Sequence, residues 1–312
     1  MAQLPTMKHK KMSLRKILRK YGVVYLMFVP VIVYYIVFHY KPLLGVVIAF
    51  KNYTFRDGIW GSSWVGLKHF NRFLGNGEFW RVFRNTIVLA ALRIAICFPA
   101  PIILALMFNE VRNQKTKKVL QTISYLPHFV SFVIVYAVFY TFLSYDGAIN
   151  TLRVHMGLDK ILYLGSPSHY RLIFVLMALW KEVGWGAIIY LAALSRVSPE
   201  LYEAAEIDGA GKFQQIYHVT LPAIRSIISI QFVRTMGGLL QVSFDQTLVM
   251  NNIMVSSVAD VMSYYIYQIG LLSRNQFSYA TAMGLFDSAL SLMIVVLTNW
   301  GAKKIDEEGG LW

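Results

Sequence analysis

The feature that most constrains this chain is a run of nineteen consecutive residues without a formal charge, residues 22–40. A helix needs about 20 apolar residues to cross the hydrocarbon core of a bilayer, so the run predicts a first membrane span. The whole chain is 56% hydrophobic and 15% charged, against roughly 45–50% and about 25% in soluble domains. An ordinary soluble enzyme is therefore excluded, and an integral membrane protein is indicated.

Five further apolar segments predict an all-α membrane protein with six transmembrane helices. Basic residues precede the first span, but no small-residue cleavage site follows it, so we expect an uncleaved anchor and not a signal peptide. Basic residues also lie between spans two and three and after the last span, which places both chain ends in the cytoplasm by the positive-inside rule. The predicted spans cover residues 22–40, 85–108, 119–143, 171–194, 224–249 and 277–300, and prolines predict kinks at Pro30, Pro99, Pro101 and Pro127.

The spans divide the chain into simple regions. A helix lying at the outer membrane interface is expected at 65–74, from the spacing of its apolar residues. The regions are a basic cytoplasmic tail 1–21, the first transmembrane helix 22–40, an extracytoplasmic loop 41–84, a five-helix core 85–300 that includes the connection 195–222, and a cytoplasmic C-terminal tail 301–312.

The net charge of +14 arises from 30 basic and 16 acidic residues. Such a balance is typical of nucleic-acid binders or of proteins at membranes, and the apolar excess favours the lipid bilayer and no nucleic acid. Membrane orientation does not explain seven basic residues in or beside the first outer loop. They predict a docking surface for a binding protein, or a positive electrostatic field that favours an acidic sugar chain. The seven residues are Lys41, Lys51, Arg56, Lys68, Arg72, Arg81 and Arg84.

The chain shows no motif for catalysis or metal binding. Its single cysteine, Cys97, excludes an internal disulfide or a cysteine-based metal cluster and is expected to pack among apolar residues. Residues 208–213 resemble a phosphate-binding loop, but Glu206 and Phe213 stand where that loop requires Gly and Ser or Thr. We therefore expect no catalytic residue, no metal and no nucleotide hydrolysis, so energy for transport must come from an ion gradient or a partner protein.

The connection 195–222, between spans four and five, differs from the other loops. Ser198 can cap a short helix that begins with Pro199 and carries an acidic residue in its first turn. Gly209 then interrupts it, and a second short helix is expected over 212–219. Two short helices at a bend predict a compact cytoplasmic projection that another protein could grip.

The same connection resembles the EAA loop of the permease subunits of ABC importers. The Leu221-Pro222 pair, twelve positions after Gly209, completes the pattern and is expected to end the second helix, while Ile216 stands where the family commonly has Phe. In that family the loop holds the coupling helix that docks into a groove on the ATPase. The resemblance assigns ATPase coupling to Glu203, Ala204, Ala205, Asp208, Gly209, Ala210 and Phe213.

The resemblance covers nearly the whole chain. Segments 41–53, 124–131 and 277–282 are similar to permeases that import oligosaccharides, some of them acidic polysaccharide fragments. It implies a type I, maltose-permease-like importer fold in a bacterial cytoplasmic membrane. It also implies a homologous second permease, an extracytoplasmic solute-binding protein, and two cytoplasmic ATPases that use ATP and Mg, so that this chain binds no cofactor itself.

Charged residues inside the predicted spans should face a partner or a water-filled cavity, because each costs about 2.5–3.5 kcal/mol at mid-bilayer. These residues are Arg93, Lys181, Glu182, Arg234, Asp245 and Asp287. Sugars bind to aromatic faces with polar groups at the rim. We therefore expect a translocation path lined by Trp180, Glu182, Trp185, Gln241 and Asp245, with structural contacts between helices as the alternative role for each.

Three other functions are left to weigh. A permease of the same type could import another small solute. An ion-coupled secondary transporter would need broken helices or an inverted repeat, and no repeated half is visible. An intramembrane enzyme would need clustered catalytic groups, whereas the charges here are scattered and mixed in sign.

Overall fold

The computed structural model describes residues 14–273, 276–306 and 309–312, so residues 1–13 of the predicted basic tail lie outside the described part. Nearly all regular structure is helical. Five segments of the described chain are long and apolar enough to cross a membrane, and a helix pair bent by 66° gives a sixth. The expected class, an all-α membrane bundle, is therefore confirmed.

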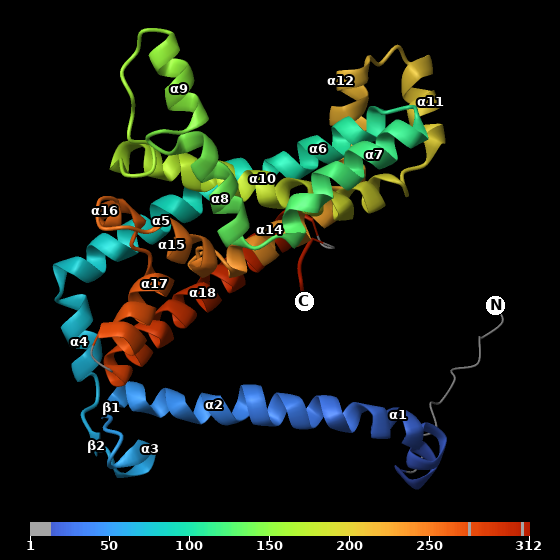
Figure 1. Ribbon diagram of the computed structural model, residues 1–312. Coiled ribbons are helices and arrows are strands. Elements are labelled where there is room, and N and C mark those ends of the chain that lie inside the picture. Colours follow the sequence, from blue (N-terminus) through green and yellow to red (C-terminus); the bar gives the residue numbers. More distant parts are fainter. Residues whose placement is uncertain (1–13, 274–275, 307–308) are drawn as a thin grey trace.

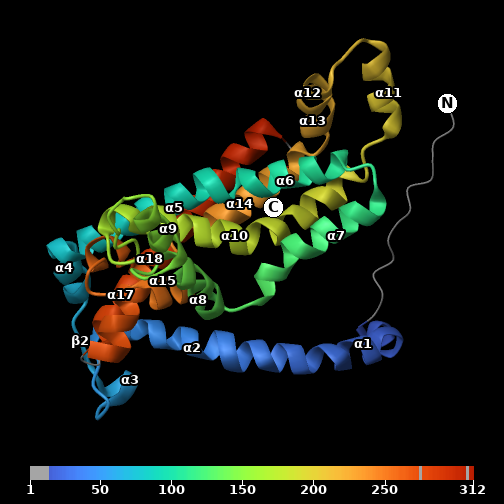
Figure 2. The ribbon, with the colours of Figure 1, turned by 45° about the horizontal axis from the view of Figure 1, so that its top comes forward.

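The first span is longer than its uncharged run. One helical rod is formed by α1 (Leu14–Tyr35), η1 (Ile36–Tyr40), α2 (Lys41–Leu43) and η2 (Leu44–Phe50). None of the apolar residues in its membrane-spanning window is buried. The rod stands apart from the other helices in both ribbon views, and only η2 at its end packs on the last helix (Figures 1 and 2).

The outer loop after the rod is short and partly extended. Two strands, β1 (Lys51–Asn52) and β2 (Ser63–Trp64), pair antiparallel around α3 (Gly58–Gly61). The expected interfacial helix is α4 (Lys68–Leu74). His69 on α4 is buried, with its Nε2 3.0 Å from the carbonyl oxygen of Lys51, which fastens α4 to β1.

The rest of the chain forms the bundle. Its helices are α5 (Gly77–Cys97), α6 (Pro99–Glu110), α7 (Gln114–Tyr125), η3 (Leu126–Phe129), α8 (Phe132–Leu143), α9 (Ala148–His155), α10 (Pro167–Leu194), α11 (Pro199–Ile207), α12 (Lys212–Gln215), η4 (Ile216–Thr220), α13 (Leu221–Ala223), α14 (Arg225–Gly237), α15 (Phe244–Met250), α16 (Ser256–Ala259), α17 (Met262–Tyr267), η5 (Gln268–Ser273) and α18 (Phe277–Ile305). Helix α10 lies at its centre, between α5, α6, α7 and α8.

Two predicted spans are interrupted. The expected helix 119–143 divides into α7 and α8 around residues 126–131, where Pro127 cannot donate to a helical hydrogen bond. The expected helix 224–249 divides into α14 and α15 around residues 238–243, at the adjacent glycines Gly237 and Gly238. Val130 from the first break and Leu239 and Val242 from the second belong to one apolar cluster with α10, so both breaks pack into the same core.

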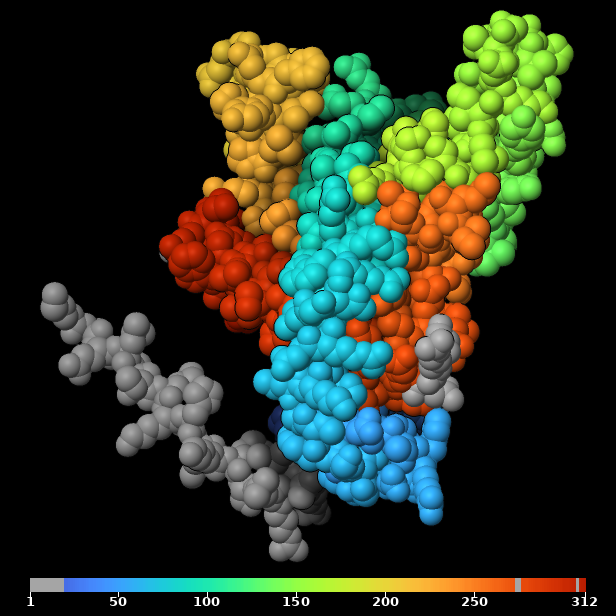
Figure 3. Space-filling view, turned by 90° about the vertical axis from the view of Figure 1, so that its left-hand side faces the viewer, coloured from blue at the N-terminus to red at the C-terminus, as the bar shows by residue number. Residues whose placement is uncertain are grey.

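The bundle has two different ends. The α6–α7 connection and α11–α12 lie at one end, and α9, α16 and α4 lie at the other (Figure 1). Figure 3 shows the α11–α12 region (gold) and the α9 region (green) as separate projections of the surface. At the α11–α12 end, Arg225 at the start of α14 is 3.3 Å from the carboxylate of Asp306, next to the end of α18.

Candidate functional site

Local signals in the sequence shape the α11–α12 projection. The Ser198 hydroxyl accepts a hydrogen bond from the backbone N–H of Glu200, and Pro199 occupies the first turn of α11, as expected. Gly209 has a φ of +80°, a left-handed conformation that costs other residues about 1–2 kcal/mol. The turn then closes because the N–H of Ala210 donates to the carbonyl oxygen of Ala205 at 2.8 Å.

The second helix of the projection is longer than the expected 212–219 and ends at Ala223, directly after the Leu221-Pro222 pair. It continues through the π-helical turn η4 and through α13 before the bend at Ile224. Pro222 lies in the first turn of α13, where the missing N–H of a proline is tolerated. The widened turn before it lets the helix pass the proline, so the projection is continuous with α14 apart from this bend.

Contacts hold the projection together and to the bundle. The hydroxyls of Tyr202 on α11 and Thr220 on η4 lie 3.0 Å apart. Lys212 at the start of α12 reaches the carboxylate of Glu110, at the end of α6, at 3.5 Å. Force applied to α11 or α12 can therefore pass into α6 and α14.

Four of the seven EAA-like residues, Ala205, Asp208, Gly209 and Ala210, line one small surface hollow. Its volume is about 310 Å³, and it is lined by Ala205, Asp208, Gly209, Ala210, Gln214, His218 and Val219. Glu203 and Ala204 are exposed on α11. Two large apolar side chains project beside the hollow, Phe213 at 89% exposure and Ile207 at 87%. Exposed apolar side chains around a hollow are typical of a protein-binding surface.

Lys181 is buried and ties α10 to the break between α7 and α8. Its Nζ donates to the carbonyl oxygens of His128 and Val130, both at 2.6 Å, and of Pro127 at 3.4 Å. The carbonyl of Pro127 also accepts from the backbone N–H of Val130 at 3.4 Å. Lys181 therefore supplies a donor to carbonyls at the interruption, and the dipoles of these carbonyls stabilise its charge.

Glu182 points to a different helix from its neighbour. Its carboxylate accepts from the guanidinium of Arg93 on α5 at 2.9 Å. Adjacent residues of a helix are rotated by about 100° about its axis. Lys181 therefore contacts the break, and Glu182 contacts α5. The expectation that these charges face partners holds for all three residues.

The two tryptophans near Glu182 contact other elements. Trp180 meets Phe139 of α8 with ring centroids 6.1 Å apart, and Trp185 stacks on His128 at 4.5 Å. Both side chains remain more than 40% exposed. Glu182 and Trp185, three residues apart, are neighbours on the surface of α10, whereas Trp180 lies on another side of the helix. The structure therefore does not gather all three into one site.

The remaining two candidates lie at the second break. Gln241 is exposed in the non-helical segment, and Asp245 is exposed in the first turn of α15. Directly after Asp245, the amide of the buried Gln246 donates to the carbonyl oxygen of Phe174 on α10 at 2.6 Å. The break is thus fixed to α10 on one side and presents polar groups on the other. Residue types alone did not select Gln246 in advance, because its partner is distant in the sequence.

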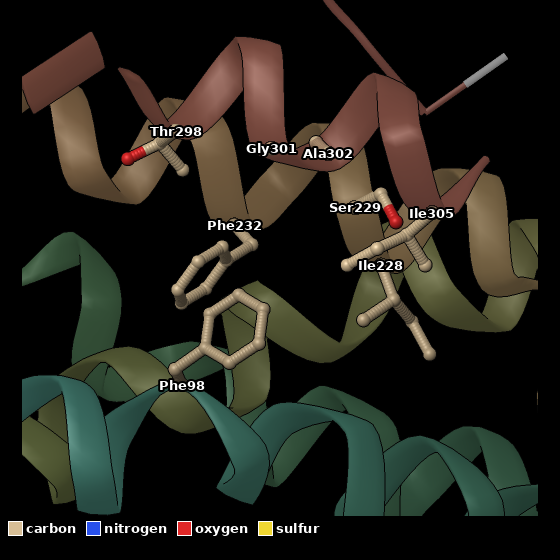
Figure 4. A pocket seen from close by; sticks show the side chains of 8 residues that line it. All are labelled: Phe98, Ile228, Ser229, Phe232, Thr298, Gly301, Ala302 and Ile305. Atoms are coloured by element: carbon tan, nitrogen blue, oxygen red, sulfur yellow. The ribbon is translucent and has the colours of Figure 1, made fainter. Parts of the chain in front are cut away.

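An apolar cavity of about 430 Å³ lies between α14, α18 and the α5–α6 junction. Figure 4 shows Phe98 and Phe232 facing each other across it, with ring centroids 5.2 Å apart. Its lining has few polar groups, which does not suit a sugar. The other lining residues are Ile228, Ser229, Thr298, Gly301, Ala302 and Ile305.

Three of the seven outer basic residues have partners within the chain. Lys51 donates to the carbonyl oxygens of Ile59 and Trp60, at 2.9 and 3.0 Å. Arg72 lies 4.5 Å from the ring centre of Tyr279, and Arg81 pairs with Asp260 at 2.8 Å. Lys51 thus closes the outer loop on itself, Arg72 holds α4 against α18, and Arg81 joins α5 to the segment after α16. A partner surface in this loop would have to use the others, such as the exposed Arg56.

The interrupted helices, the projecting helical pair and the unburied first rod define an integral-membrane permease. Comparison of sequences identifies the class further. Residues 97–307 match the family described as binding-protein-dependent transport system inner membrane component, and the chain belongs to this family.

Two curated relatives and two crystal structures extend over nearly the whole chain. The polygalacturonan/rhamnogalacturonan transport system permease protein YteP of Bacillus subtilis (strain 168) is 45% identical, over 97% of this chain and 94% of its own length. Protein LplB of the same organism is 43% identical, over 91% and 90%. One structure is of a bacterial alginate ABC transporter in complex with its alginate pentasaccharide-bound periplasmic protein. It aligns with a TM-score of 0.86 and 37% identity, over 94% of this chain and 98% of the other. The second is of a bacterial ABC transporter that imports the acidic polysaccharide alginate, with a TM-score of 0.87 and 37% identity, over 94% and 99%. The fold is therefore that of a type I ABC importer permease.

Proposed function

We propose that this chain is a transmembrane subunit of an ATP-driven importer for acidic oligosaccharides of the uronic-acid type. The observation that carries the proposal is its 45% identity to a polygalacturonan/rhamnogalacturonan permease over 97% of the chain. The alginate importer structure, whose polysaccharide is also acidic, supports the same substrate class. Another small solute is the alternative within this family.

The energy source in this proposal is a pair of cytoplasmic ATPases that bind ATP and Mg. The projection α11–α12 is their docking element, with Glu203, Ala204, Ala205, Asp208, Gly209, Ala210 and Phe213 as the coupling residues. Two observations support this role: the hollow lined by part of this set, and the exposed Phe213 and Ile207 beside it. An ion-coupled transporter would leave this projection without a role.

A second, homologous permease completes the membrane part. The first rod supports this partner, since its spanning window is 0% buried and it stands away from the bundle (Figure 1). We infer that a second permease covers at least one side of the rod. An extracytoplasmic solute-binding protein delivers the sugar at the end that carries α9 and α16.

The assembly lies in the bacterial cytoplasmic membrane with both ends of this chain inside. This orientation follows from the basic α6–α7 connection, which lies at the same end of the bundle as α11–α12. The chain binds no cofactor and catalyses no reaction, and the partner subunits hydrolyse ATP.

The substrate class can be tested by the ATPase activity of the reconstituted assembly. Its binding protein is loaded in turn with an oligogalacturonate, with the methyl ester of the same oligosaccharide, and with a neutral malto-oligosaccharide. We expect the acidic oligosaccharide to stimulate hydrolysis most strongly. Stimulation by the neutral malto-oligosaccharide that equals or exceeds stimulation by the acidic one would refute an acidic substrate.

A further inference from the structure

One arginine lies at membrane depth on a helix surface. Arg234 is in the last turn of α14, nine residues after Arg225. At 1.5 Å per residue it lies about 14 Å from that cytoplasmic end. One turn later Gly237 packs closely against Val295, which lies ten residues before the end of α18. Both helices thus place Arg234 near the middle of the membrane.

Arg234 differs from the other cations that the sequence places within the spans. Lys181 is held by three carbonyls, and Arg93 is paired with Glu182. The Arg234 side chain is exposed and has no ion pair among the described residues. A lipid-facing arginine at this depth costs about 2.5–3.5 kcal/mol on insertion scales, so the guanidinium should face water or a partner.

The neighbouring chain favours water. Residues 238–243 are non-helical, and backbone of this kind is tolerated at membrane depth only inside protein or along a water-filled cavity. Leu239 and Val242 pack into the core, whereas Gly238 and Gln241 are exposed. The exposed side of the break thus begins at Gly238, one helical turn after Arg234.

We propose that Arg234 faces the translocation path and binds the carboxylate of a uronic-acid residue as the sugar passes. The inference rests on the proposed function and adds a specificity-determining residue to it. The guanidinium offers two parallel N–H donors that match the two oxygens of a carboxylate. Gln241 and the carboxylate of Asp245 can exchange hydrogen bonds with sugar hydroxyls.

The test compares a charged and an uncharged form of one sugar. Uptake of trigalacturonate and of its fully methyl-esterified form is measured in proteoliposomes that contain the complete assembly. Each sugar is supplied at a concentration that saturates the binding protein, determined separately. The variants are Arg234→Gln, Arg234→Lys and, as a matched control, Arg112→Gln, which removes an exposed arginine from the α6–α7 connection.

We expect Arg234→Gln to lower the ratio of acid to ester uptake by about tenfold or more, the value of one lost charge-assisted hydrogen bond. Arg234→Lys should retain most of the ratio, and Arg112→Gln should leave it unchanged. An unchanged ratio in Arg234→Gln overturns the inference, as does an equal loss of both sugars or loss of the assembled complex, since these indicate pairing with the second permease. If the unaltered assembly fails to import trigalacturonate, the proposed function itself fails.

Discussion

The contact between α10 and α7 makes a sharp steric prediction. Gly184 on α10 faces the carbonyl group of Ser124 on α7, and an ideal Cβ at Gly184 would lie 2.0 Å from that oxygen and 2.3 Å from its carbon. Ordinary contact between carbon atoms is about 3.5–4.0 Å, so Gly184→Ala requires the two helices to separate by more than about 1 Å. The obstructing atoms are backbone, which cannot rotate away.

The steric cost of Gly184→Ala in free energy of unfolding can be separated from the effect of helix propensity by a matched control. Overpacking costs about 1–3 kcal/mol, and the backbone contact places Gly184→Ala at the upper end of that range. Gly284 on α18 is also inside a helix, but nothing lies within 4 Å of its ideal Cβ. Both substitutions gain about 0.5–1 kcal/mol of helix propensity, so the difference between them measures the steric term alone.

The assay is the apparent melting temperature of the purified permease pair in detergent. Gly184→Ala should melt several degrees below the unaltered protein, and Gly284→Ala at or above it. Transport should also fall in Gly184→Ala, because α7 leads into the break that Lys181 holds. Equal melting temperatures for the two variants would refute the packing argument.

Three further predictions concern other parts of the chain. Gly209→Val should reduce co-purification of the ATPases, because a valine held at a φ of +80° is strained by about 1–2 kcal/mol. Gly211→Ala, at a φ of −69°, should not reduce it. Equal ATPase yields from the two variants would contradict this prediction. Glu182→Gln leaves the Arg93 guanidinium unpaired and should lower the free energy of unfolding by about 1–2 kcal/mol, a value discounted because the carboxylate is 40% exposed. The double variant Glu182→Gln/Arg93→Gln should recover part of this loss. Additive losses in the two single variants and the double variant would exclude coupling between the residues. Burial lowers the pKa of His69 below 6.5, so the unfolded state binds the proton more readily and the stability of the fold should fall as the pH drops below 6.5. The melting temperature of His69→Gln should lose this dependence on pH. An unchanged dependence of melting temperature on pH would assign the effect to another group.

Local sequence signals predicted the projection well. Ser198, Pro199 and Gly209 act within one or two turns of themselves, so α11 and the bend after it follow from the sequence. The second helix extends past the predicted last residue, Val219, to Ala223, because the π-helical turn before Pro222 depends on the path of the chain and not on residue preference.

The interruptions of the spans could not be read from hydropathy. Residues 119–143 are apolar throughout most of their length, about half of residues 224–249 are apolar, and Pro127 alone suggested a kink and not a break. The broken segment 126–131 is stable because Lys181, more than fifty residues away, donates to its carbonyls. The partners of the outer basic residues could not be predicted either, since they lie far along the chain, as with Arg81 and Asp260.

Energy coupling through the α11–α12 projection is the central claim and can be measured directly. Proteoliposomes that contain the complete assembly are loaded with ATP, and uptake of trigalacturonate is followed with all ion gradients collapsed by ionophores. The account predicts uptake that requires ATP and the binding protein, is unaffected by ionophores, and is lost in Glu203→Lys. Uptake that persists without ATP and disappears with the ion gradients would contradict it.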